Sequence, residues 1–114
     1  MSAARLDRTL AALAAPDRRR IVDLLRERPY RAGELAGALR SSFPAVSRHL
    51  RALRESGLVD EQRDAFDSRV RVYSLRPQPM AELKAWLEQT ENAWAEQLVA
   101  FKAHVGKKKR GCPR

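Results

Sequence analysis

Hydrophobic residues recur at intervals of three and four along most of the chain, which is the period of an α-helix. Before residue 58 this pattern predicts four helices, at about residues 3–14, 16–28, 32–39 and 43–56. Each is short and amphipathic, so each needs neighbours to bury its apolar stripe. The first helix has only a weak polar side, so we expect it to be buried both by a partner surface and by the core of its own chain.

Residues that favour helix ends separate these segments. Pro16 fits the first turn of the second helix, and Pro29 ends that helix. Ser42 is a good N-cap for the fourth helix, with Pro44 in its first turn, and Gly57 favours a left-handed cap at its end. The tight turn between the third and fourth helices predicts a helix-turn-helix.

Beyond Gly57 the pattern changes to alternation, which predicts strands at 58–63 and 69–75 around a hairpin tip at 64–68. In the second strand, Arg69 and Arg71 share a face with Tyr73 and Leu75. The tip contains Phe66, to which the sequence alone assigns no role. The hairpin is therefore expected to be a basic wing.

The last predicted helix, at about 80–105, carries a continuous apolar seam with Trp94 at its centre. A 114-residue chain offers too little surface to cover this seam, so we expect it to pair with its copy in a homodimer. The expected dimer interface combines the first and last helices and consists of Leu6, Leu10, Leu13, Leu83, Leu87, Trp94, Leu98 and Phe101.

Together these elements predict a mainly α fold with a small β-hairpin wing, a winged helix-turn-helix. We expect residues 1–105 to form one DNA-binding and dimerisation domain and residues 106–114 to be a basic disordered tail. The net charge of +9 fits a nucleic-acid partner, although five of the charges lie in the last eight residues. No apolar run is long enough to span a membrane and no signal peptide is evident, so we expect a cytoplasmic protein.

The sequence offers no chemistry for catalysis, cofactor binding or metal binding. There is one cysteine, Cys112, and the two histidines, His49 and His104, are far apart. No Gly-rich phosphate loop and no nucleophile with a base are present, so we expect no enzyme.

The fourth helix is the expected recognition helix, because Arg48 and Arg51 lie opposite its apolar stripe and one turn apart. Arginine can bond two acceptors of guanine at once, whereas hydroxyls and the helix N-terminus suit phosphates. For His49, a packing role is weighed above a phosphate contact. The expected DNA-binding residues are Ser42, Pro44, Ser47, Arg48, His49, Arg51, Arg63, Arg69 and Arg71.

The chain resembles the ArsR (arsenic-repressor-like) family through LAALAAPDRRRI at 10–21, GELA at 33–36 and PAVSRHLRALRESGLV at 44–59. The resemblance covers about residues 5–105 and implies a homodimeric repressor that binds short inverted repeats. Its arsenic and cadmium sensors carry two cysteines on the third helix, where this chain has Ala36 and Ala38. Its zinc sensors use ligands on the last helix that this chain lacks. The resemblance therefore points to the metal-independent branch. Phe43 departs from the polar residue common in the family.

Two alternatives from other classes remain open. The chain could coat or shape nucleic acid without sequence preference, through its basic tail. It could instead be a protein-partner module whose seam binds a different chain. A small-molecule effector between the long helices, near Trp86, Trp94 and Phe101, is conceivable but not indicated by the sequence.

Overall fold

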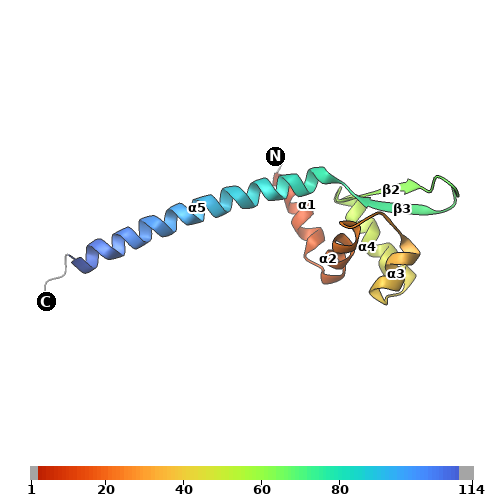
Figure 1. The fold of residues 1–114 in the computed structure, drawn as a ribbon, viewed down its shortest axis with the longest axis horizontal. Helices are drawn as coiled ribbons and strands as arrows, with labels where there is room; N and C mark the ends of the chain where they lie inside the picture. The colour runs from red at the N-terminus through yellow and green to blue at the C-terminus, as the bar shows by residue number, and fades with distance from the viewer. Residues whose placement is uncertain (1–2, 111–114) are drawn as a thin grey trace. The chain divides into compact units, whose positions relative to one another are not determined.

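A computed structural model describes residues 3–110, with side chains as far as Gly106 (Figure 1). The chain divides into two compact units, residues 1–83 and 84–114. In chain order the elements are α1 (Ala3–Leu13), α2 (Pro16–Leu25), β1 (Tyr30–Arg31), α3 (Ala32–Leu39), α4 (Phe43–Glu55), β2 (Val59–Arg63), β3 (Arg71–Leu75) and α5 (Pro77–Arg110). This is the mainly helical winged helix-turn-helix that the sequence predicts.

The core of the first unit lies between α2, α3, α4 and the base of the sheet. Its fully buried side chains are those that the helical period places inward. They come from α2, α3 and α4 and from Leu58, which directly precedes β2, and so join the three helices to the base of the sheet: Ile21, Leu35, Val46, Leu50, Leu53 and Leu58.

The wing belongs to a three-stranded antiparallel sheet with the strand order β1-β3-β2. In its register Tyr30 lies opposite Tyr73, and Arg63 lies opposite Arg71. The sequence analysis missed β1, because two residues are too few to show an alternating pattern. This strand matters for the wing, since it joins the start of α3 directly to β3.

The ends of α4 are fixed as the sequence predicts. The Ala45 N–H donates to the Ser42 Oγ at 3.2 Å, and Pro44 lies in the first turn. Gly57 follows the helix with φ of 83°, a left-handed conformation that glycine adopts without strain. The turn before α4 also contains a left-handed residue, Arg40 with φ of 52°, which no feature of the sequence predicts.

Helix α1 differs in detail from the predicted leucine stripe. Its buried residues are Thr9 and Ala12, whereas Leu6 and Leu13 are half-buried and Leu10 remains 40% exposed. The three leucines therefore flank the inward face of α1 rather than form it. An ion pair of 2.9 Å between Arg5 and Glu82 connects α1 to the first turns of α5.

Helix α5 is longer than predicted at both ends. It starts at Pro77, because a proline without an N–H is tolerated in a first turn. It continues through residues 106–110, which the sequence analysis assigned to a disordered tail. Lysine and arginine have high intrinsic helix propensity, so residues of these types extend a helix readily. The rest of the predicted tail, residues 111–114, lies outside the described residues.

Ser42→Ala is expected to lower the free energy of unfolding by about 1 kcal/mol, because it removes the side-chain acceptor that caps α4. Denaturant titrations at one fixed protein concentration measure this change. The control is Ser68→Ala in the exposed wing loop, which should leave the unfolding midpoint unchanged. Equal midpoints for all three proteins would show that the cap contributes nothing.

Candidate nucleic-acid interface

The N-terminal end of α4, the start of α3 and the wing surround one groove on the first unit. Its lining includes Ala32, Gly33, Glu34 and Ser47 together with cationic and aromatic side chains. The latter come from β1, α4 and the wing, so three segments that are distant in sequence meet here: Arg31, Phe43, Arg69, Arg71 and Tyr73.

Helix α4 has one buried face and one exposed face. Val46, Leu50 and Leu53 are buried, and Pro44, Arg48 and Arg51 are exposed on the other side of the helix. Because the buried stripe is fixed in the core, the two arginines have no freedom to turn inward. This is the arrangement that the helical period predicts for a helix entering a major groove.

The two arginines differ in their local contacts. Arg51 is 80% exposed and forms a surface ion pair of 3.3 Å with Glu55 one turn later. Within residues 3–110, Arg48 takes part in no ion pair. A surface pair such as Arg51–Glu55 contributes little to stability, so Arg51 can exchange Glu55 for another partner. Arg48 is therefore the more readily available donor on this face.

His49 is held within the first unit. The Arg18 Nε donates to His49 Nδ1 at 3.4 Å, and His49 Nε2 lies 3.7 Å from an Asp17 carboxylate oxygen. Its side chain is 25% exposed. These contacts connect α2 to α4, which fits the packing role that the sequence analysis weighed above a phosphate contact.

The wing is less basic than expected. Between Val59 and Leu75 it carries four carboxylates as well as three arginines, and the sequence analysis considered only the arginines. Arg71 pairs with Glu61 at 3.0 Å and Arg69 with Asp67 at 3.3 Å. Arg63 has no ion pair in the part of the chain that the structure describes. Opposite charges in the wing therefore leave Arg63 as its most available cation.

Arg69 also lies in the hairpin loop and not in the strand predicted from 69, since β3 begins at Arg71. The cause is Asp67, whose carboxylate accepts the Arg69 N–H at 3.0 Å. The Asp67 carbonyl in turn accepts the Val70 N–H at 3.0 Å. An aspartate that bonds its own backbone two residues ahead forms a turn, which delays the strand.

Asp64 connects the wing to the base of α3. One carboxylate oxygen accepts the Phe66 N–H at 2.8 Å, and the other binds the Arg31 guanidinium at 2.7 Å. Both contacts stabilise the charged carboxylate and hold the pKa of Asp64 below its ordinary value. The hydrogen bond from the Phe66 N–H has the larger effect, and the one from Arg31 comes next. Glu34 bonds the Arg31 N–H at 3.0 Å and Arg28 at 3.1 Å, which lowers the pKa of Glu34. Arg31 is thus the residue shared by the helix-turn-helix and the wing, and the sequence analysis missed it.

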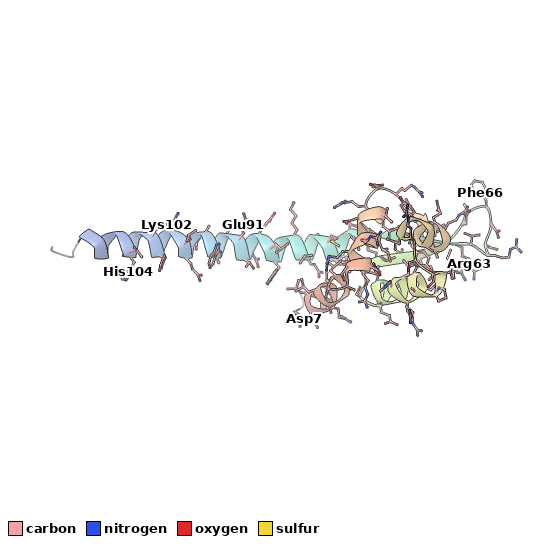
Figure 2. The ribbon with its side chains drawn as sticks, turned by 90° about the horizontal axis from the view of Figure 1, so that it is seen from below. Asp7, Arg63, Phe66, Glu91, Lys102 and His104 are labelled. Carbon is pink, nitrogen blue, oxygen red and sulfur yellow. The ribbon has the colours of Figure 1, made fainter. Side chains whose placement is uncertain are left out.

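Phe66 projects from the wing tip and is fully exposed (Figure 2). Phe43 at the start of α4 is 58% exposed. Among residues 3–110, no cluster of three His, Cys, Asp or Glu side chains could hold a metal ion, and no helix is long and apolar enough to cross a membrane.

Known proteins that are similar to this chain are bacterial transcriptional regulators. The family described as "Bacterial regulatory protein, arsR family" matches residues 15–61. The HTH-type transcriptional regulator Rv2034 of Mycobacterium tuberculosis is 38% identical over 95 residues, which cover 83% of this chain and 83% of that protein.

Solved structures agree. An ArsR-like transcriptional regulator from Rhodococcus sp. RHA1 superposes with a TM-score of 0.74 at 29% identity, covering 88% of this chain and 92% of that one. A homodimeric winged helix-turn-helix DNA-binding domain from Mycobacterium bovis superposes with a TM-score of 0.62 at 26% identity. The superposed region covers 82% of this chain and 83% of the Mycobacterium bovis domain.

Arg63→Ala is expected to lower the slope of log affinity for DNA against log salt concentration by about 1 per subunit, since it removes one phosphate contact. Arg71→Ala is the matched comparison and should lower the slope less, because Glu61 already binds that guanidinium. Fluorescence anisotropy titrations at four salt concentrations measure both slopes. A larger effect of Arg71→Ala would show that the ion pair opens on DNA.

Proposed function

Because the chain belongs to the ArsR family of DNA-binding transcriptional regulators, which are not enzymes, we propose that it is a repressor without a metal effector that binds an inverted repeat as a homodimer. The observation that carries this proposal is the face of α4. The helix is capped at Ser42, anchored by buried leucines, and presents Arg48 and Arg51 outward beside a wing.

Sequence-specific binding is supported by the rigidity of this face. A side chain reads a base edge only if its helix is held in a fixed orientation, and α4 is held by three buried residues and by the contact of His49 with α2. The positive N-terminal end of the helix dipole also favours a phosphate at Ser42 and Phe43. Arg48 and Arg51 then face the groove floor with donors suited to guanine.

Homodimerisation is supported by the second unit. Residues 91–104 of α5 are exposed throughout, including apolar side chains along one seam. Trp94 is 64% and Phe101 63% exposed. An isolated helix cannot bury such side chains by itself, and a second copy supplies the same seam with two-fold symmetry. The proposed dimer contacts on α5 are Leu83, Leu87, Trp94, Leu98 and Phe101.

A repressor is the simplest regulator that this chain can be, because repression requires only that the protein occupy its DNA site. The absence of a metal effector is proposed from the residues at the positions where metal-sensing relatives have ligands, Ala36 and Ala38, since methyl groups cannot coordinate an ion.

The test is selection of bound duplexes from a random pool at near-physiological salt. We expect one inverted repeat to be enriched, both by the full chain and by a chain shortened to residues 1–105. The shortened chain should bind somewhat more weakly with the same preference. No enrichment by either protein would contradict the proposal. Loss of all binding on shortening would instead favour non-specific binding through the basic tail.

Arg48→Ala should relax the preference at one base pair of each half-site, where a good bidentate arginine contact discriminates by about 1–3 kcal/mol. Arg26→Ala is a matched control, because this arginine is exposed at the C-cap of α2 and its ion pair is with Asp23 of the same helix. A uniform loss of affinity for all sequences in the Arg48 variant would show that Arg48 contacts only phosphate.

Trp94→Ala should weaken the dimer by about 2 kcal/mol or more, roughly a thirtyfold rise in its dissociation constant, if Trp94 is a central contact. Sedimentation equilibrium measures that constant. The control is Val99→Ala, because Val99 is also apolar and is 68% exposed but lies about 140° round α5 from Trp94. Equal effects of the two variants would contradict the assigned seam.

A further inference from the structure

We propose that Phe66 acts as an apolar wedge that enters the minor groove and opens the base step beside each half-site. This inference rests on the proposed function, because it gives the DNA-binding wing a second way of reading sequence. No metal, cofactor or additional partner is involved.

The first support is the exposure of Phe66. Its side chain is 100% exposed at the end of the hairpin, and it points away from the body of the first unit (Figure 2). Its chain neighbours, Ala65 and Asp67, leave the ring uncovered. Apolar side chains that enter the minor groove insert between bases, unstack them and kink the duplex. The side chain regains by burial between bases much of what it loses by exposure to water.

The second support is the fixed backbone that presents Phe66. Its N–H donates to the Asp64 carboxylate at 2.8 Å, and the other oxygen of that carboxylate is bound by Arg31 at 2.7 Å. The loop is closed by the Asp64 N–H, which donates to the Val70 carbonyl at 2.9 Å. The position of Phe66 is thus tied to the start of α3. A wedge held in this way loses little conformational entropy on insertion.

The third support is the distribution of charge in the wing. The wing as a whole has more carboxylates than arginines, so attraction to phosphates does not by itself explain a wing–DNA contact. At the tip, however, Asp64 and Asp67 are each paired with an arginine. Arg63, on the adjoining strand, has no ion pair within the described residues and can bind a phosphate beside the insertion. Phe66 then supplies the remaining attraction.

A protein or membrane surface fits Phe66 less well than DNA. A stable protein interface buries about 800 Å² per partner, and the tip offers one apolar side chain among charged ones. A minor-groove wedge, in contrast, needs only a single side chain next to a cation. Pyrimidine–purine steps unstack most easily, so the wedge should favour TA or CA/TG at the flank of each half-site.

The experiment uses the full chain and the inverted repeat obtained by selection, with 2-aminopurine placed at successive flanking positions. Wild-type protein should raise the 2-aminopurine fluorescence severalfold at one position per half-site, because unstacking relieves quenching. Phe66→Ser should abolish this rise and bind about tenfold more weakly, whereas Phe66→Leu should keep most of both. The matched control is Ser68→Ala in the same loop, which should behave like wild type.

The outcomes separate the two proposals. If wild-type protein selects no repeat, the proposed function fails and this inference fails with it. If a repeat is selected and bound but the fluorescence is the same for wild type and Phe66→Ser, only the wedge is wrong. An affinity loss in Phe66→Ser without any position of raised fluorescence also overturns the wedge. Repeating the selection with Phe66→Ser should remove the preference for flexible flanking steps, and an unchanged preference contradicts the inference.

Discussion

The burial of Val46, Leu50 and Leu53 is the contact on which the rest of the first unit depends. These residues lie on one side of α4 and are almost fully excluded from water by α2, α3 and the sheet. Because the helix has a fixed period, burying this stripe sets the direction of every other side chain on it. Arg48 and Arg51 point outward for this reason. The orientation of the exposed face is thus a consequence of core packing.

The wing depends on a second, electrostatic link. Arg31 ends the short strand β1, precedes α3, and binds the Asp64 carboxylate that in turn bonds the Phe66 backbone. One guanidinium therefore couples the helix-turn-helix to the hairpin tip. The same wing pairs Arg69 and Arg71 with carboxylates, which reduces its attraction for phosphate. Together these contacts favour a wing that is well positioned but weakly charged.

The sequence predicted the elements of the fold well, because helical and alternating periods report burial directly. The third helix and the caps at Ser42 and Gly57 are confirmed. Three features required the structure. The strand at Tyr30 is too short to show a period, the leucines of α1 lie beside its buried face, and α5 continues to Arg110. The pairs Arg31–Asp64 and Arg71–Glu61 were missed because the sheet, and not closeness in sequence, brings their partners together.

The central claim is that two copies of α4, held in one dimer, read two half-sites on the same side of the duplex. Two-fold-related recognition helices bind sites one helical turn apart, about 34–36 Å. The most direct measurement is the affinity for repeats in which the spacing between half-sites is increased by about 5 base pairs, half a turn. The account predicts that affinity falls to that of a single half-site. Unchanged affinity for the widened repeat would contradict it, since each copy would then bind on its own.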